Sequence, residues 1–221
     1  MFKKIVAILV VLVLAVAGFI ASRPSAYRVE RNRTVNAPAE VAFAQVADFH
    51  KWEGWSPWAK LDPSMKLTIE GEPGQVGSSY AWEGNEKVGA GKMTIVEVTP
   101  SSAVKIKTEF LKPMAWTSET VFAFAPVENG TTTTWSMAGQ YNFVQKAFAT
   151  FNDMDKMIGA DFEKGLAQLD TAAAAEAKKI AEAAAAAQAA AAAAAPAPTE
   201  GAAAPAPAVV PAAATAGKPT K

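Results

Sequence analysis

Few side chains in this sequence could carry out acid–base or metal chemistry. His50 is the only histidine, and a pKa near neutrality would suit it to general acid or base catalysis. The sequence shows no serine and acidic residue arranged with His50 as a catalytic triad. The alternative for His50 is a surface or capping role. The chain contains no cysteine, which excludes thiolate nucleophiles and leaves carboxylates as the main candidate metal ligands.

The acidic residues do not form a recognisable site either. Asp153 and Asp155 are separated by one residue in a predicted helix, so they do not share a face and make a poor metal site. We expect them to be exposed or paired with Lys156. Glu109 alternates with apolar residues in a predicted strand and should face solvent. We therefore predict no catalytic residue, no metal and no cofactor.

Aromatic and methionine side chains are the more distinctive feature. The chain has 6 Trp and 7 Met, and such side chains suit a pocket that accommodates apolar molecules of varied shape. Trp52, Trp55 and Trp58 cluster in a segment that Pro57 should keep from forming a regular helix. They could form the lid or mouth of a pocket, or they could plug one end of the core.

These aromatic residues must be positioned by a sheet. Alternating apolar and polar residues, bounded by Gly, Pro and Asn, predict strands joined as an antiparallel meander. A short helix should follow the first strand, with Asn36 as its polar cap and Pro38 at its start, and a helical turn should lead into the Trp-rich loop. The predicted strands are 26–35, 67–71, 77–83, 88–98, 103–110, 116–126 and 131–140.

The last predicted element is a long amphipathic helix from Phe143 to Asp170, with apolar residues at spacings of three and four. Gly159 and Gly165 interrupt it, either to allow close packing on the sheet or to permit a mild bend. The Ala-rich run that follows should continue the helix until Pro196, beyond which a Pro/Ala-rich tail should be disordered.

The N-terminus predicts a membrane segment. An uninterrupted apolar run extends from Ile5 to Ala21, close to the roughly 20 residues that span a bilayer. We favour a retained anchor over a cleaved signal peptide, because Phe19 and Ile20 continue the run beyond the small-residue site Ala15-Val16-Ala17. The chain should therefore divide into an anchor or signal segment (1–24), a folded domain (25–170), a helical extension (171–195) and a disordered tail (196–221).

Charge restricts the possible binding partners and the cellular location of the protein. Lys+Arg and Asp+Glu both number 21, so the positive surface needed to bind DNA or RNA through phosphates is absent and no nucleic acid is expected. Lys3 and Lys4 predict a cytoplasmic N-terminus, although Arg23 and Arg28 weaken that orientation. We expect a membrane-anchored protein with an extracytoplasmic domain, which would be periplasmic in a Gram-negative cell.

The sequence resembles the SRPBCC superfamily, which includes START, Bet v 1-like and polyketide cyclase/dehydrase-type proteins, and in particular its membrane-anchored bacterial branch. The resemblance covers about Tyr27 to Leu169. It implies an α+β helix-grip fold, with a curved antiparallel sheet of about six or seven strands around a long C-terminal helix and two short helices after strand 1. The segments that carry the resemblance are Trp52-Glu-Gly-Trp55-Ser-Pro-Trp58, Tyr80-Ala-Trp82-Glu-Gly-Asn85, Gly89-Ala-Gly91-Lys-Met93-Thr-Ile95, Phe110-Leu-Lys-Pro113, Thr134-Trp135-Ser-Met137 and Asp153-Met-Asp155-Lys-Met-Ile-Gly159.

The resemblance also implies an apolar cavity between sheet and helix. We predict a membrane-tethered module that holds a hydrophobic small molecule or lipid there; the alternatives are a cyclase/dehydrase-like enzyme, or a non-catalytic envelope protein that contacts a partner or the cell wall through its tail. An enzymatic role is less favoured than binding. The predicted ligand-binding residues are Trp52, Trp55, Trp58, Tyr80, Trp82, Phe110, Trp116, Trp135, Met137, Phe151, Met154 and Ile158.

Overall fold

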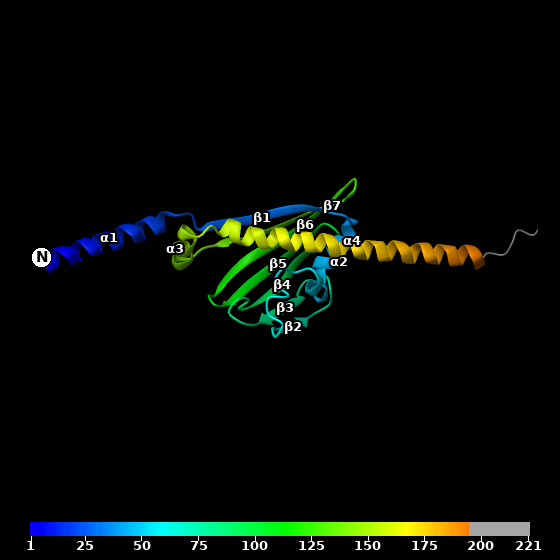
Figure 1. Ribbon diagram of the computed structural model, residues 1–221, viewed down its shortest axis with the longest axis horizontal. Helices are drawn as coiled ribbons and strands as arrows, with labels where there is room; N and C mark the ends of the chain where they lie inside the picture. The colour runs from blue at the N-terminus through cyan, green and yellow to red at the C-terminus, as the bar shows by residue number, and fades with distance from the viewer. Residues whose placement is uncertain (195–221) are drawn as a thin grey trace, which may run out of the picture. The chain divides into compact units, whose positions relative to one another are not determined.

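Seven strands form one antiparallel sheet in the order β1-β7-β6-β5-β4-β3-β2 in the computed structural model, which describes residues 1–194 (Figure 1). From β2 to β7, strands that are consecutive in sequence are also neighbours in the sheet. Strand β1 instead pairs with β7. The strands are β1 (Ala26–Val35), β2 (Lys66–Glu70), β3 (Ser79–Glu83), β4 (Ala90–Thr99), β5 (Ala103–Lys112), β6 (Trp116–Val127) and β7 (Gly130–Gln140).

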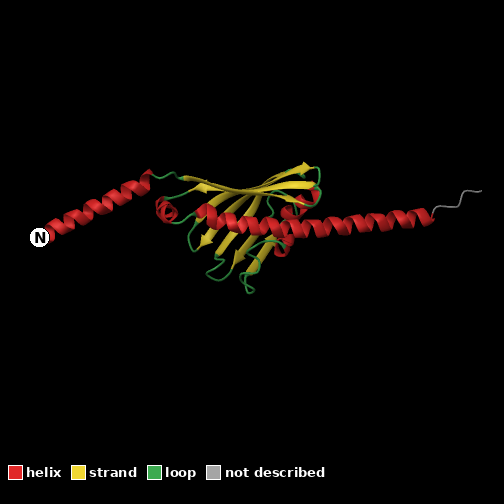
Figure 2. Ribbon diagram, turned by 45° about the horizontal axis from the view of Figure 1, so that its top comes forward, coloured by secondary structure: helices red, strands yellow, loops and turns green. Residues whose placement is uncertain are grey.

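Helices precede, interrupt and follow this meander. The long helix α4 crosses one face of the sheet (Figure 2), and the short helices α2 and η1 follow β1. This is the helix-grip arrangement expected from the sequence. The helices are α1 (Phe2–Ser22), α2 (Ala39–Ala47), the 3₁₀ helix η1 (Phe49–Gly54), α3 (Phe143–Phe151) and α4 (Met154–Ala194).

The chain divides into two units, Met1–Glu182 and Ala183–Lys221. The sheet, the shorter helices and most of α4 belong to the first unit, and the described part of the second is the end of α4. The predicted disordered tail, 196–221, lies outside the described residues.

Strand alternation determines which side chains face α4. In β5 and β6 all the buried residues are even-numbered, as with Ile106 and Phe122, whereas their odd-numbered neighbours are more exposed. Trp135 of β7 stacks on Phe162 of α4, with ring centroids 4.1 Å apart. The face that carries these residues is called the inner face below, and the opposite one the outer face.

The prediction of one continuous helix from Phe143 is wrong. Asn142 and Gln145 form a capping box that begins α3, and Asn152 then adopts an extended conformation (φ −128°, ψ 133°). The Asp153 carboxylate accepts a hydrogen bond from Lys156 N at 3.1 Å, which caps the start of α4. The apolar spacing of three and four residues is the same on both sides of this break, so periodicity alone predicts a single continuous helix.

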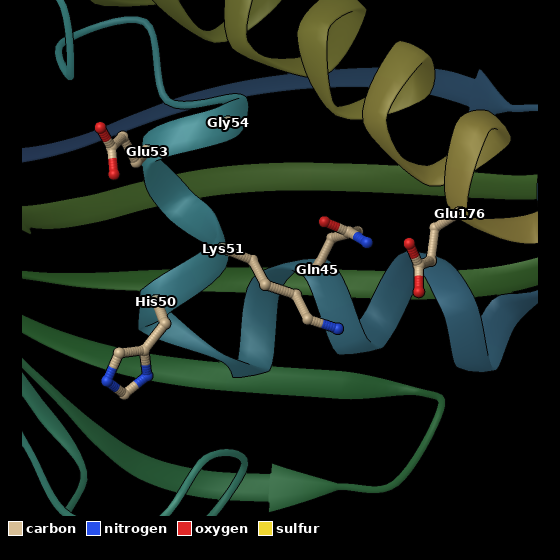
Figure 3. Close-up of a pocket in the computed structure, with 6 residues that line it drawn as sticks. All are labelled: Gln45, His50, Lys51, Glu53, Gly54 and Glu176. Atoms are coloured by element: carbon tan, nitrogen blue, oxygen red, sulfur yellow. The ribbon is translucent and has the colours of Figure 1, made fainter. Parts of the chain in front are cut away.

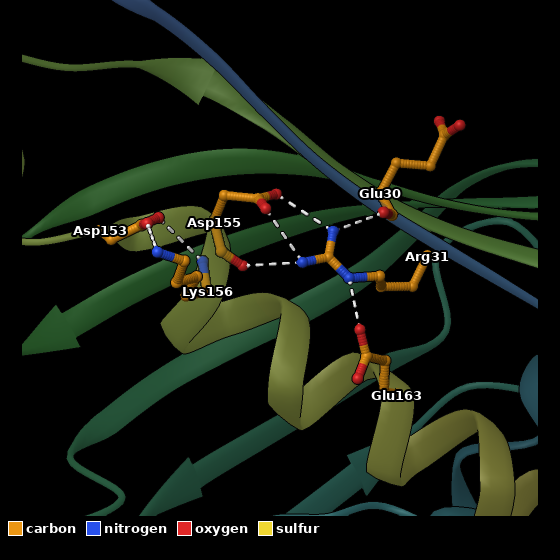
Figure 4. A network of polar contacts seen from close by, with 6 residues as sticks. All are labelled: Glu30, Arg31, Asp153, Asp155, Lys156 and Glu163. Carbon is orange, nitrogen blue, oxygen red and sulfur yellow. Dashed lines mark hydrogen bonds and ion pairs between the residues drawn. The ribbon is translucent and has the colours of Figure 1, made fainter.

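The two glycines of α4 allow close packing, one of the two roles predicted for them. A Cβ at Gly165 would lie 2.6 Å from the Trp135 ring, and one at Gly159 would lie 2.0 Å from the Arg31 guanidinium. Arg31 on β1 uses that space to bind α4 (Figure 4). Its Nη1 and Nη2 donate to the Asp155 carboxylate at 3.1 and 3.0 Å, and its Nε donates to Glu163 at 2.8 Å.

The beginning of α2 also differs from the prediction. Asn36 does not cap this helix, because α2 follows Pro38 without a side-chain cap. The backbone and side-chain nitrogens of Asn36 donate instead to Asp170 of α4, at 2.8 and 3.0 Å. Asn36 therefore joins the end of β1 to α4.

Candidate ligand-binding site

One end of the inner face is filled by a cluster that we call the tryptophan core, comprising Trp52, Trp55, Phe122, Trp135 and Phe162. Each of these residues is at most 2% exposed. Their rings touch edge to face or stack, at centroid distances such as 5.9 Å between Trp55 and Trp135. A bound molecule could contact them only if this end of the domain opened.

Two indole groups of the Trp-rich loop, those of Trp52 and Trp55, are satisfied within the protein. Trp52 Nε1 donates to the carbonyl of Val46 at 2.8 Å, and Trp55 Nε1 donates to that of Gln45 at 3.0 Å. Trp58 is half-buried and packs edge-on against Trp135, with centroids 5.7 Å apart. Of the two roles considered for this loop, these are the contacts of a core plug.

The other end of the inner face carries a continuous row of half-buried rings, called here the aromatic strip: Trp82, Phe110, Trp116, Tyr27 and Tyr141. Phe110 and Trp116 stack with centroids 4.6 Å apart, and Tyr27 and Tyr141 stack at 4.4 Å. Trp116 also contacts Tyr27 at 5.8 Å, and Trp82 contacts Phe110 at 5.9 Å. The strip joins rings from four strands, β1, β3, β5 and β6, and Tyr141 after the end of β7 into one apolar surface that remains partly open.

Register explains why these rings align. Phe110 lies opposite Gly91 on one side and Trp116 on the other, and Gly91 lies opposite Trp82. Gly91 is required here because a Cβ would lie 2.4 Å from the Trp82 ring. Gly139 serves Tyr27 in the same way, since a Cβ there would lie 2.7 Å from the tyrosine hydroxyl.

A row of hydroxyl groups lies next to the strip on the inner face. Thr108 pairs with Ser118 across β5 and β6, Ser118 pairs with Gly139, and Gly139 pairs with Tyr27. Thr108 Oγ1 lies 3.1 Å from Thr120 Oγ1, so these two satisfy each other. The Tyr27 hydroxyl and Ser118 Oγ are buried without a partner at hydrogen-bonding geometry.

Unpaired buried hydroxyls are costly, by about 1–3 kcal/mol each, and native structures contain few of them. Burial raises the pKa of Tyr27 well above its usual value. The neighbouring Tyr141 adds to the rise, and the Ser118 hydroxyl, which lies against that of Tyr27, opposes it through a weak hydrogen bond. Tyr27 therefore remains a neutral phenol at physiological pH. It can donate or accept a hydrogen bond but cannot serve as a base.

The other predicted ligand-binding residues are spread along the inner face and beyond it. Tyr80 and Met137 are buried at 8% and 7% exposure, and Ile158 of α4 is half-buried against the core. Met154 is half-buried at the start of α4. Phe151 is 77% exposed at the end of α3, so the helix break separates it from the other predicted residues.

His50 lies at a charged hollow outside the sheet–helix interior. The hollow, of about 420 Å³, is lined by Gln45, His50, Lys51, Glu53, Gly54 and Glu176 (Figure 3). His50 Nδ1 is 3.0 Å from Asp48 Oδ1, and the same oxygen accepts the His50 backbone N–H. His50 thus takes part in capping η1, the second of the two roles predicted for it.

The acidic residues follow the expected pattern. Asp153 pairs with Lys156 at 2.9 Å, and Glu109 pairs with Lys107 at 2.7 Å on the outer face. A second hollow, of about 630 Å³, also lies on the outer face and includes Lys107, Glu119 and Gln140. Among residues 1–194, no group of three His, Asp or Glu side chains could hold a metal ion.

Sequence reasoning missed Tyr27, Tyr141, Ser118 and Thr108 as site residues. Tyr27 and Thr108 have the parity of the buried residues Val29 and Ile106, so strand alternation could have identified them. Tyr141 follows the last strand and carries no such signal. The sequence prediction rested on large apolar side chains, and the small hydroxyls of Ser118 and Thr108 carry no such signal.

Comparison with known proteins agrees with the architecture. The sequence profile of a family described as polyketide cyclase/dehydrase and lipid transport matches residues 26–174. A comparison with curated proteins found no match.

Several solved structures share the fold at low sequence identity. A protein of unknown function from Staphylococcus aureus superposes with a TM-score of 0.53 at 11% identity, covering 71% of this chain and 98% of that one. A protein from Rhizobium leguminosarum gives 0.51 at 13%, covering 68% and 96%. The di-domain ARO/CYC StfQ from the steffimycin biosynthetic pathway gives a TM-score of 0.52 at 14% identity, covering 72% of this chain and 52% of StfQ.

Identities this low show a shared fold alone. The profile match shows more than the fold, because it covers the whole sheet and the part of α4 that packs on it. The chain belongs to the polyketide cyclase/dehydrase and lipid transport family of the SRPBCC superfamily.

Proposed function

We propose that the protein is a membrane-tethered module that binds a hydrophobic small molecule or a lipid on the aromatic strip. The observation that carries this proposal is the pairing of a partly open aromatic surface with two neighbouring buried hydroxyls, Tyr27 and Ser118, that no other polar group of the protein satisfies. A guest with an apolar body and one polar group would cover the rings and satisfy the hydroxyls.

The two ends of the inner face support this location differently. The tryptophan core is closely packed and at most 2% exposed, so a guest there would first have to displace core side chains. The rings of the strip are half-buried and would gain about 25 cal/mol for each Å² of apolar surface covered. The strip is therefore the favoured site, and Trp82, Phe110 and Trp116 are the residues of the sequence prediction that it retains.

Binding is favoured over catalysis by the chemistry of the strip. A cyclase or dehydrase needs a group that exchanges a proton with its substrate. The ionisable groups in the strip are Tyr27 and Tyr141, and burial raises the pKa of both. Phenols that stay protonated position a guest through a hydrogen bond and do not remove a proton from it.

The tether in this proposal is α1. It is 21 residues long and is the one helix among residues 1–194 that is long and apolar enough to cross a membrane. Lys3 and Lys4 precede its apolar run and favour a cytoplasmic N-terminus, which would place the domain outside the cytoplasm. Because the chain has no native cysteine, a single cysteine at Glu128→Cys would report this orientation through labelling by an impermeant maleimide.

The binding proposal is tested on a fragment of residues 25–182. Solved neighbours that are covered at 96% and 98% consist of little besides this fold, so the fragment should fold without α1. The probe is cis-parinaric acid, a fluorescent fatty acid. We expect saturable fluorescence enhancement, and Trp116→Ala should weaken binding by at least about tenfold, or about 1.4 kcal/mol.

Thr117→Ala is the matched control. Thr117 adjoins Trp116 in β6 but has the opposite parity and lines the hollow on the outer face. The Thr117→Ala fragment should bind cis-parinaric acid as tightly as the wild-type fragment does. Absence of saturable binding, or equal loss in both variants, would contradict the proposed site.

A further inference from the structure

Helix α3 exposes a row of large apolar side chains that the binding site does not use. Phe143, Val144, Phe148 and Phe151 are 51%, 61%, 50% and 77% exposed within a helix of nine residues. Val144, Phe148 and Phe151 follow one another at spacings of four and three, which places them on one side of the helix. Exposed apolar surface concentrated in this way marks an interaction site rather than ordinary surface.

The chain itself holds α3 close to the end of α1. Helix α1 ends at Ser22, and three residues later Ser25 O accepts a hydrogen bond from Tyr141 N at 2.8 Å. Helix α3 begins two residues after Tyr141, at Phe143. At about 3.5 Å per residue, these short links keep the start of α3 within roughly 20 Å of the end of α1.

A direct contact strengthens this connection. Lys146 of α3 donates from Nζ to the carbonyl oxygen of Ala21, 3.1 Å away in the last turn of α1. Carbonyls in the last turn of a helix lack partners within it and attract a cation. Lys146 is the only charged residue in the sequence of α3, Phe-Val-Gln-Lys-Ala-Phe-Ala-Thr-Phe.

We propose that α3 lies in the interface of the bilayer that α1 spans, with Val144, Phe148 and Phe151 among the lipid chains. An amphipathic helix with phenylalanines on one face is suited to that position. The β5–β6 turn also exposes apolar side chains, since Leu111 and Met114 are 62% and 40% exposed between Phe110 and Trp116 of the strip. The aromatic strip would then open towards lipid, so an apolar guest would exchange without crossing water.

This inference rests on the tether of the proposed function, and the test separates the two. Full-length single-cysteine variants carry the polarity-sensitive fluorophore NBD, in nanodiscs of phosphatidylcholine and phosphatidylglycerol with one protein per disc. Val11→Cys reports α1, Val144→Cys and Phe148→Cys report α3, and Glu128→Cys reports the distant β6–β7 turn. Brominated lipid chains quench only probes that they can contact.

We expect bromine quenching and a blue-shifted emission at Val11→Cys, Val144→Cys and Phe148→Cys, because each of these probes would contact lipid chains. Glu128→Cys should be unquenched. Quenching at Val11→Cys without quenching at α3 would overturn the inference and leave the tether standing. No quenching at any position would overturn both.

Two further outcomes address other occupants of the α3 face. A blue shift at Phe148→Cys that bromine does not quench would mean that protein covers the face, and it would overturn the inference. Phe148→Asp provides an independent check in full-length protein. With a probe retained at Val144→Cys, it should abolish the quenching there and leave the quenching of Val11→Cys unchanged; persistence of the Val144→Cys signal would count against insertion.

Discussion

The two ends of the inner face are built from the same kind of residue but differ in packing. The tryptophan core and the aromatic strip each contain two or more Trp or Phe rings in contact. In the core, the rings are at most 2% exposed and the Trp52 and Trp55 indoles are hydrogen-bonded. In the strip, the rings are half-buried and lie beside the Tyr27 and Ser118 hydroxyls. An abundance of aromatic residues therefore does not by itself indicate a pocket. Exposure separates the closely packed rings from those that a guest could reach, whereas an unpaired polar group does not, since Trp135 Nε1 in the core also lacks a partner.

The largest expected effect is on stability, at the core end. Trp135→Ala should lower the free energy of unfolding by about 3–5 kcal/mol, because the ring stacks on Phe162 at 4.1 Å and contacts Trp55. In the 25–182 fragment this corresponds to a fall in Tm of roughly 10 °C. Trp116→Ala in the strip should cost less than about 2 kcal/mol. Thermal unfolding followed by circular dichroism measures both, and similar losses would remove the distinction between the two ends.

The glycines of α4 provide a finer comparison of rigid and adjustable neighbours. Gly165→Ala should destabilise the domain by about 1–3 kcal/mol, because its Cβ would meet the buried Trp135 ring and Pro57, at 2.6 and 3.1 Å. In Gly159→Ala the nearest atoms to the new Cβ would be those at the end of the Arg31 side chain, which can move. The roughly 1 kcal/mol by which alanine favours a helix should leave that variant near neutral. Urea unfolding of the two variants tests this order, and a larger loss at Gly159→Ala would reverse it.

The smallest expected effect is a change in pH dependence at the start of α4. Hydrogen bonds from Arg31 lower the pKa of Asp155 below its usual 3.8. The folded state therefore binds fewer protons than the unfolded chain in this range, and the stabilisation from this carboxylate is lost as pH falls through the native pKa. Between about pH 6 and about pH 3, Asp155→Asn should lose less Tm than the wild-type fragment. Parallel Tm–pH curves would show that the Arg31 pair does not contribute to folding.

Much of the fold could be predicted from local patterns. The first strand begins and ends as expected, at Ala26 and Val35, because alternation and the following Asn-Ala-Pro segment determine both ends. The division between α3 and α4 was not predictable from periodicity, since apolar spacing continues across Asn152 and Asp153 while capping interactions break the helix. Capping depends on which side chain reaches which backbone N–H, and the sequence indicates that less strongly than it indicates an apolar stripe.

The candidate site was less predictable than the fold. Sequence patterns identify Trp55 and Trp116 equally well as aromatic residues near a sheet, but only the packing shows that one is 1% exposed and the other half-buried. The Tyr27 and Ser118 hydroxyls become conspicuous only when their neighbours are known to leave them unpaired. Exposure and hydrogen bonding arise from contacts between distant segments, which a single sequence does not specify.

The most direct test follows each tryptophan separately while a guest binds. Fluorine NMR of the 25–182 fragment labelled with 5-fluorotryptophan should resolve one signal for each of the 6 Trp residues, assigned through single Trp→Phe variants. On titration with cis-parinaric acid, the signals of Trp82 and Trp116 should shift saturably while those of Trp52 and Trp55 stay in place. Shifts confined to Trp52 and Trp55, or the absence of any saturable shift, would contradict binding at the aromatic strip.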